Sequence, residues 1–132
     1  MLMDGGCSVE GYQSDITRTF VFGKPTDRQR KIWDLEKKAQ DAGFATEMDA
    51  FGLNFCHGLG LGLHERPLIS RLNSFREPIE LKAGMVFAVE TYCPASDGVS
   101  AARIEEEVIL TPSGAKIISL YPAEDLPIAN PY

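Results

Sequence analysis

The sequence has few cysteines, no long apolar run and few basic residues, and each of these absences argues against a class of protein. It has three cysteines and no Cys-x-x-Cys pair, which argues against a disulfide framework or a cysteine-type zinc site and favours the cytoplasm. No apolar run approaches the length of a bilayer span, and no N-terminal stretch has the pattern of a signal peptide. Basic residues are also few, 13 against 19 acidic ones, and the net charge of −6 disfavours nucleic acid or an anionic membrane as a partner.

What is present fits a single domain, residues 1–132, of α+β class. The chain is 44% hydrophobic and 24% charged, as in ordinary globular proteins. A helix is predicted from Thr26 or Asp27 to about residue 42, ending at Gly43. Its apolar stripe would consist of Ile32, Leu35, Ala39 and Ala42. Runs rich in β-branched and aromatic residues predict strands at residues 15–22, 85–92, 102–110 and 115–120.

Both histidines of the chain, His57 and His64, lie in the glycine-rich segment HGLGLGLH. Three glycines between them disfavour a helix, at about 1 kcal/mol each, and favour a close approach of backbone. In a regular strand, residues seven apart point to opposite faces, so only a backbone interrupted by glycine brings both rings into one cleft. Taken singly, each histidine is more often an exposed ring or a satisfied core residue.

Four acidic residues stand out because each interrupts an apolar pattern. Asp4 ends an apolar run, Asp15 opens an apolar strand, and Glu90 and Glu105 lie inside the strands MVFAVETY and ARIEEEVIL. Each could be an edge residue that faces water. If buried, a carboxylate must be protonated, paired or bound to a metal. Together with a histidine, four carboxylates form the donor set for a pair of divalent metals, which can activate water for attack on a carbonyl.

Four blocks carry a family resemblance: DGGCSVEGYQSDITRTF, HGLGLGLHERP, GMVFAVE and ARIEEEVIL, in this order. They resemble the pita-bread metallopeptidases, which include methionine aminopeptidase, aminopeptidase P and the Xaa-Pro dipeptidases. The resemblance extends over nearly the whole chain. It implies an α+β pita-bread (creatinase/aminopeptidase) fold and a peptide-cleaving hydrolase with two divalent metal ions. An oxygen-rich site with one imidazole favours manganese or cobalt and allows iron or zinc.

The resemblance also implies roles for particular residues. The metal ligands would be Asp4, Asp15, His57, Glu90 and Glu105. The catalytic residues would be His64, which matches a histidine that contacts the substrate, and Glu90, which would also carry protons.

Arg103, two residues before Glu105, resembles the Xaa-Pro dipeptidase and aminopeptidase P branch of the family. On a strand, Arg103 and Glu105 point the same way, so the guanidinium would bind a substrate carboxylate or order the metal ligands. The alternative is a simple Arg–Glu pair between strands. Arg18 and Lys116 are expected to be solvated or paired surface charges.

The chain departs from the family pattern at its start. It begins almost at the first ligand, so residues 1–132 are expected to be a truncated, C-terminal portion of the catalytic domain that lacks the N-terminal half. The connection over residues 44–56 is also short for the family. Exposed sheet faces and edges predict a homodimer or higher homo-oligomer. The alternative to an Xaa-Pro peptidase is an incomplete fragment, or a non-peptidase relative that binds metal or a partner or performs creatinase- or lyase-type chemistry.

Overall fold

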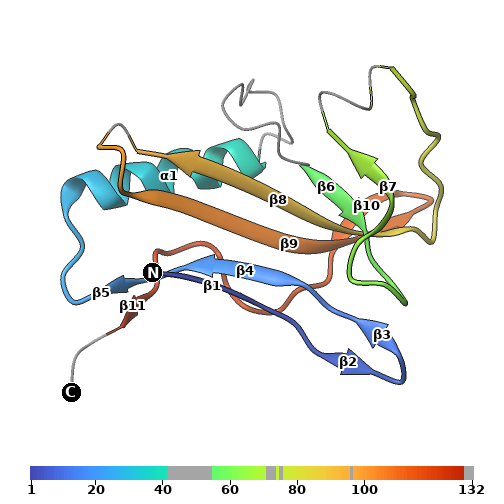
Figure 1. The fold of residues 1–132 in the computed structure, drawn as a ribbon, viewed down its shortest axis with the longest axis horizontal. Helices are drawn as coiled ribbons and strands as arrows, with labels where there is room; N and C mark the ends of the chain where they lie inside the picture. Colours follow the sequence, from blue (N-terminus) through green and yellow to red (C-terminus); the bar gives the residue numbers. More distant parts are fainter. Residues whose placement is uncertain (42–54, 71–73, 75, 96, 130–132) are drawn as a thin grey trace.

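The computed structural model describes residues 1–41, 55–70, 74, 76–95 and 97–129, and it has the α+β organisation that the sequence predicts. Helix α1 (Asp27–Asp41) lies against strands β8 (Val86–Pro94) and β9 (Ala101–Thr111) (Figure 1). Within the described part of the chain, no helix combines the length and hydropathy needed to cross a membrane. The predicted features of residues 42–54 lie outside the described residues.

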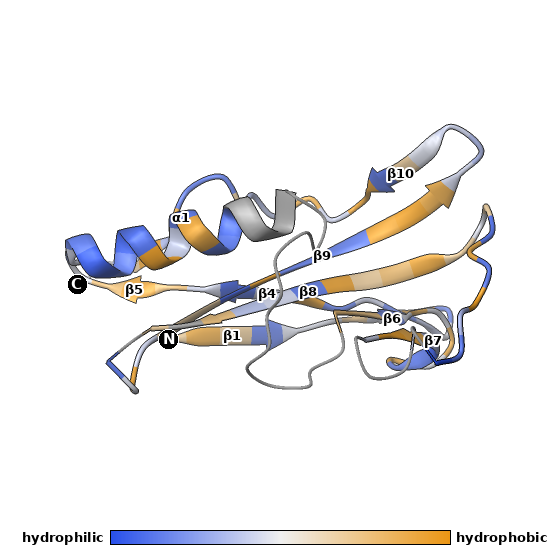
Figure 2. Cartoon of the chain, turned by 90° about the horizontal axis from the view of Figure 1, so that it is seen from above, coloured by the Kyte–Doolittle hydropathy of each residue, from blue (hydrophilic) through white to orange (hydrophobic). Residues whose placement is uncertain are grey.

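The main sheet is antiparallel and has the strand order β10-β9-β8-β6-β7. Its remaining strands are β6 (Cys56–Gly58), β7 (Glu65–Ile69) and β10 (Gly114–Ile117). The predicted strands at residues 85–92 and 102–110 correspond to β8 and β9, and the predicted hairpin joins β9 to β10. Figure 2 shows a hydrophilic stretch in β9 directly before its hydrophobic end.

A second, two-stranded sheet pairs β1 (Leu2–Gly5) with β4 (Ile16–Thr19), and a small hairpin joins β2 (Ser8–Val9) to β3 (Tyr12–Gln13). The prediction of one continuous strand at residues 15–22 is wrong. The segment forms two strands, β4 and β5 (Val21–Phe22), because β5 pairs in parallel with β11 (Ile128–Ala129) near the end of the chain.

Helix α1 begins where the sequence predicts, with a capping box at Thr26. The Gln29 backbone N–H donates to Thr26 Oγ1 at 3.2 Å, and the Thr26 N–H donates to Gln29 Oε1 at 2.8 Å. Ile32 is buried with Ala95 and Ala102, and Trp33 is buried with Ile104 and with Ala123 of the C-terminal segment.

The predicted apolar stripe of α1 is wrong at Leu35, which is 49% exposed, whereas Glu36 is fully buried. The buried face passes through Ile32, Trp33 and Glu36, so the helix is rotated away from the face that apolar spacing alone favours. The side chains of Ala39 and Ala42, and Gly43, lie outside the described part.

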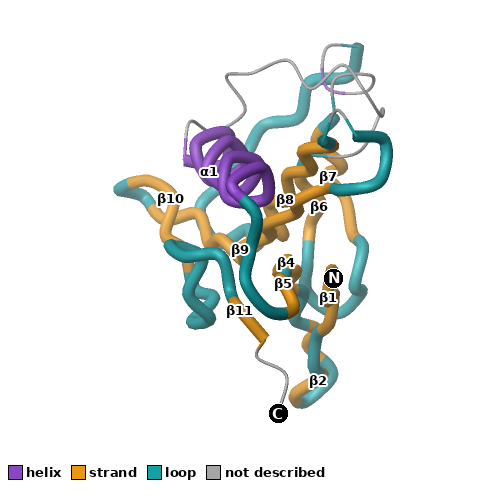
Figure 3. The backbone as a smooth tube through the Cα atoms, turned by 90° about the vertical axis from the view of Figure 1, so that its left-hand side faces the viewer, coloured by secondary structure: helices purple, strands orange, loops and turns teal. Residues whose placement is uncertain are grey.

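The two faces of the main sheet carry different kinds of residue. Ala102 and Ile104 of β9 pack towards the helix, whereas Arg103 and Glu105 alternate with them and project to the other face. The β1–β4 sheet lies beside β9, as the end-on view in Figure 3 also shows. The acidic residues of both sheets therefore face a common region.

Candidate metal centre

The centre of the site is the imidazole of His57, which is buried in the middle of β6. Its Nδ1 lies 3.0 Å from the carbonyl oxygen of Gly58. A carbonyl oxygen only accepts hydrogen bonds, so Nδ1 donates in this contact and Nε2 is the ring nitrogen that faces the carboxylates. Nε2 has no hydrogen-bond partner among the described residues.

Three carboxylates surround this nitrogen. His57 Nε2 lies 3.6 Å from Asp15 Oδ2, 3.9 Å from Glu105 Oε1 and 4.0 Å from Glu90 Oε1. A proton on Nε2 would pair with these carboxylates, and a cation among the four groups would be bound by all of them. One imidazole and three carboxylates are donor groups that bind divalent cations, so the residues present fit a metal ion.

Strand register explains why two of these carboxylates meet. Glu90 of β8 and Glu105 of β9 are directly opposite each other in the antiparallel ladder, so both side chains project from the same face. Like charges at such positions are destabilising unless a cation lies between them. Burial, the largest cause, raises the pKa of Glu105 to about 7, and neighbouring Asp15 adds to the increase.

The remaining acidic residues come from the two-stranded sheet. Asp4 lies on β1 opposite Thr17 of β4, and Asp15 immediately precedes β4. Ligand atoms of Asp4, Asp15 and Glu105 all lie within 4.8 Å of one another. Asp15 is buried, and burial, followed by the charge of Asp4, raises its pKa. Asp4 is exposed, although one of its carboxylate oxygens reaches the cluster.

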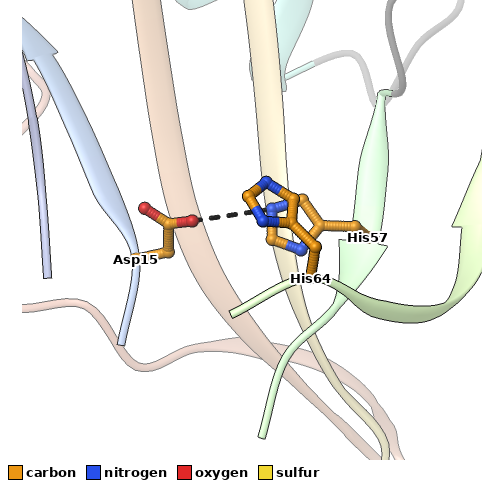
Figure 4. Close-up of side chains that lie close together, drawn as sticks. All are labelled: Asp15, His57 and His64. Carbon is orange, nitrogen blue, oxygen red and sulfur yellow. Dashed lines mark ion pairs between the residues drawn. The ribbon is translucent and has the colours of Figure 1, made fainter. Parts of the chain in front are cut away.

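The glycine-rich segment brings the second histidine to the first, as its sequence predicts. A bulge follows His57, and a Cβ on Gly58 would lie 2.6 Å from the backbone oxygen of Arg66, so only glycine fits this close approach. The chain then turns so that the exposed His64 ring lies 4.2 Å, centroid to centroid, from the His57 ring (Figure 4). Ligand atoms of Asp15, His57 and His64 also lie within 4.8 Å of one another.

Arg103 projects into the same region and forms an ion pair with Glu90 Oε2. The two residues are diagonal neighbours on β8 and β9, because Arg103 is opposite Tyr92. The pair fits both sequence-based alternatives, because Glu90 is itself one of the expected metal ligands. The guanidinium holds the Glu90 carboxylate in place beside His57.

Sequence reasoning missed several residues that support the acidic cluster. The expectation that Arg18 is a surface charge is wrong: it is buried, pairs with Glu106 at 2.6 Å and donates to the Glu105 carbonyl oxygen. Thr17 Oγ1 donates to the Glu105 carboxylate. A signal for Thr17 existed, since it is two residues after Asp15 and shares its face in a strand. Lys116 is exposed, as expected.

Comparisons with known proteins agree with this arrangement. A sequence model of metallopeptidase family M24 matches residues 1–56 and 42–112. The chain is 36% identical over 140 residues to an Xaa-Pro dipeptidase of Pyrococcus furiosus, covering 88% of this chain and 38% of that protein. It is 34% identical over 146 residues to YqhT of Bacillus subtilis, an uncharacterized peptidase, covering 92% of this chain and 39% of that protein.

The crystal structure of an X-Pro aminopeptidase from Thermotoga maritima superposes with a TM-score of 0.82 at 29% identity, over 97% of this chain and 40% of that chain. The chain thus spans about two-fifths of the length of the relatives that it matches. With the family model extending over most of the chain and the acidic cluster assembled around His57, the chain belongs to metallopeptidase family M24 and has part of that family's pita-bread fold.

Proposed function

We propose that this chain carries the metal centre of a dinuclear-metal-dependent hydrolase that acts on Xaa-Pro peptides. The observation that carries the proposal is the buried Nε2 of His57, which lies among three carboxylates and has no hydrogen-bond partner in the part of the chain that the structure describes. The substrate class rests on likeness to proteins named Xaa-Pro dipeptidase and X-Pro aminopeptidase. Arg103, placed beside Glu90, is the feature of this chain that fits that branch.

The residues that would hold two metal ions form one connected donor set. They are Asp4, Asp15, His57, Glu90 and Glu105. Four carboxylates and one imidazole favour manganese or cobalt, with iron and zinc as alternatives. When bound, the ions would supply Lewis-acid polarisation of the peptide carbonyl and activation of water.

The chain's own residues then perform the remaining tasks. His64 is exposed beside His57, so it can donate a hydrogen bond to a substrate oxygen. Glu90 lies within reach of the same cleft and is the residue placed to accept and return a proton. Arg103 restrains Glu90 through its ion pair and is partly exposed, which leaves donors available to a substrate carboxylate.

The Glu105→Ala variant tests the ligand assignment. Glu105, like Asp15, belongs to two of the candidate ligand groups, so its loss is expected to abolish metal uptake and hydrolysis together. Metal content is measured by mass spectrometry after loading with Mn²⁺ or Co²⁺ and gel filtration. Glu80→Ala, which removes an exposed carboxylate that pairs with Lys82, is the matched control. Unchanged metal content in Glu105→Ala refutes the assignment.

A second candidate is a chain that binds metal without turnover. The observation in its favour is that the chain spans about two-fifths of its relatives' length, so these 132 residues by themselves correspond to only part of a relative's chain. Incubation of the metal-loaded chain with Xaa-Pro dipeptides and detection of free proline separates the two functions. Bound metal with no proline release supports the second candidate.

We propose further that residues 1–132 form one domain, that copies of it associate, and that it is located in the cytoplasm. Leu2 and Met3 of β1 are exposed, as is Met1 before them, and Phe22 is 70% exposed, which is the kind of apolar surface that a second copy covers. All three cysteines are free thiols, as a reducing compartment permits. Light scattering at micromolar concentration tests association, a single unfolding transition tests the domain, and cell fractionation tests the location.

A further inference from the structure

The two sheets that supply the acidic cluster lie next to each other, and hydrogen bonds of side chains connect them. Strand β4 pairs with β1, and β9 pairs with β8 and β10, so β4 and β9 belong to different sheets although they lie next to each other (Figure 1). Asp4 and Asp15 come from the first sheet, and His57, Glu90 and Glu105 come from the second. The separation of the two groups of ligands therefore depends on the contacts between β4 and β9.

These contacts form a regular series that we name the β4–β9 seam. Its members are Asp15, Thr17 and Thr19 on one side and Arg103, Glu105 and Glu107 on the other. Thr19 Oγ1 donates to the Arg103 carbonyl oxygen at 3.0 Å and accepts from the Arg103 N–H at 2.8 Å. Thr17 Oγ1 donates to the Glu105 carboxylate, and the Asp15 N–H donates to Glu107 Oε1 at 2.6 Å. Side chains thus replace the backbone ladder of a continuous sheet.

Glu107 closes the seam at the end nearest Asp15. Glu107 is half-buried, and its backbone N–H donates to Ser119 Oγ at 3.1 Å. This hydrogen bond holds the backbone of β9 at Glu107. The carboxylate oxygen Oε1 of Glu107 accepts from the Asp15 N–H at 2.6 Å. This bond holds the backbone of Asp15, whose own carboxylate lies 3.6 Å from His57 Nε2.

We propose that Glu107 is a positioning residue that sets the place of Asp15 in the metal centre, an inference that rests on the proposed function. Glu107 acts through the Asp15 backbone and is not itself a ligand. Supporting groups behind metal ligands typically change metal affinity by about 10–100-fold when removed. Loss of the Glu107 acceptor is therefore expected to weaken metal binding even though all five proposed ligands remain.

The experiment compares Glu107→Ala, Glu107→Gln and the control Glu80→Ala with the wild-type chain. The Co²⁺ or Mn²⁺ dissociation constant is measured by calorimetry, and the Co²⁺ absorption spectrum reports the ligand geometry. Glu107→Ala is expected to bind at least about 10-fold more weakly, whereas Glu107→Gln keeps an acceptor oxygen and restores most of the affinity. Hydrogen exchange at the Asp15 amide in metal-free protein gives a second readout and is expected to be about 10-fold faster in Glu107→Ala.

Each outcome decides the proposal. Metal affinity and Asp15 amide exchange in Glu107→Ala equal to those of Glu80→Ala overturn the positioning role while leaving the metal centre intact. Equal losses in Glu107→Gln and Glu107→Ala also overturn it, because charge would then matter and the acceptor would not. A wild-type chain that takes up no metal overturns the proposed function. In that case, unchanged Asp15 exchange in the alanine variant shows independently that Glu107 does not hold this backbone.

Discussion

The buried carboxyl group of Glu36 makes the stability of this chain depend on pH in a defined way. Glu36 lies on α1 facing the sheet and is fully buried. Burial raises its pKa from 4.5 to about 7, and Thr91, the Ile104 backbone and Arg103 offset only part of that increase. Because the pKa is higher in the folded chain than in the unfolded chain, the neutral group favours folding at low pH. That advantage is lost as the pH rises from 4.5 to about 7.

The size of the effect follows from the shift. One pKa unit corresponds to about 1.4 kcal/mol, so the ionised group lowers the free energy of unfolding by about 3 kcal/mol once the pH exceeds the folded-state pKa. The Glu36→Gln variant keeps the shape of the side chain and cannot ionise. It is therefore expected to gain stability over the wild type as the pH rises. The gain at pH 8 should exceed the gain at pH 5 by about 2 kcal/mol.

Urea unfolding in metal-free buffer at pH 5 and pH 8 measures this difference. Effects of the substitution that do not depend on pH cancel when the two values are subtracted. Asp34→Asn, which removes an exposed carboxylate from the same helix, is the matched control. Its free energy of unfolding is expected to equal that of the wild type at pH 5 and at pH 8. If the Glu36→Gln difference from wild type is the same at pH 5 and pH 8, the reasoning about burial of Glu36 is refuted.

Two further predictions concern the segment around His57. Gly58→Ala places a Cβ 2.6 Å from the Arg66 backbone oxygen and is expected to destabilise the chain by about 1–3 kcal/mol in a thermal or urea melt. Gly5→Ala, where no atom lies within 4 Å, should change stability by less than about 1 kcal/mol; equal losses would contradict the close-approach argument. Burial raises the pKa of Cys56 to about 12, so iodoacetamide should alkylate it at least about 100-fold more slowly than exposed Cys7. Mass spectrometry of native protein checks this, and comparable rates would show that Cys56 is accessible.

Much of the candidate site could be predicted from local sequence pattern. Period-two alternation predicts that Arg103 and Glu105 share a face, and both do project away from the helix. The glycines between His57 and His64 predict an interrupted backbone, and the structure brings the two rings within 4.2 Å. These features depend on residues close together in the chain, which is why spacing and residue type suffice.

The sequence by itself determined the α+β class, the strands that carry Glu90 and Glu105, and the family to which the chain belongs. Only the tertiary structure decided that Glu36 and not Leu35 faces the sheet, because the rotation of a helix depends on what packs against it. It also decided the burial of Arg18, whose partner Glu106 is 88 positions away, and the seam contact between Asp15 and Glu107, 92 positions apart. Such contacts depend on how separate elements pack together, and no local periodicity encodes that packing.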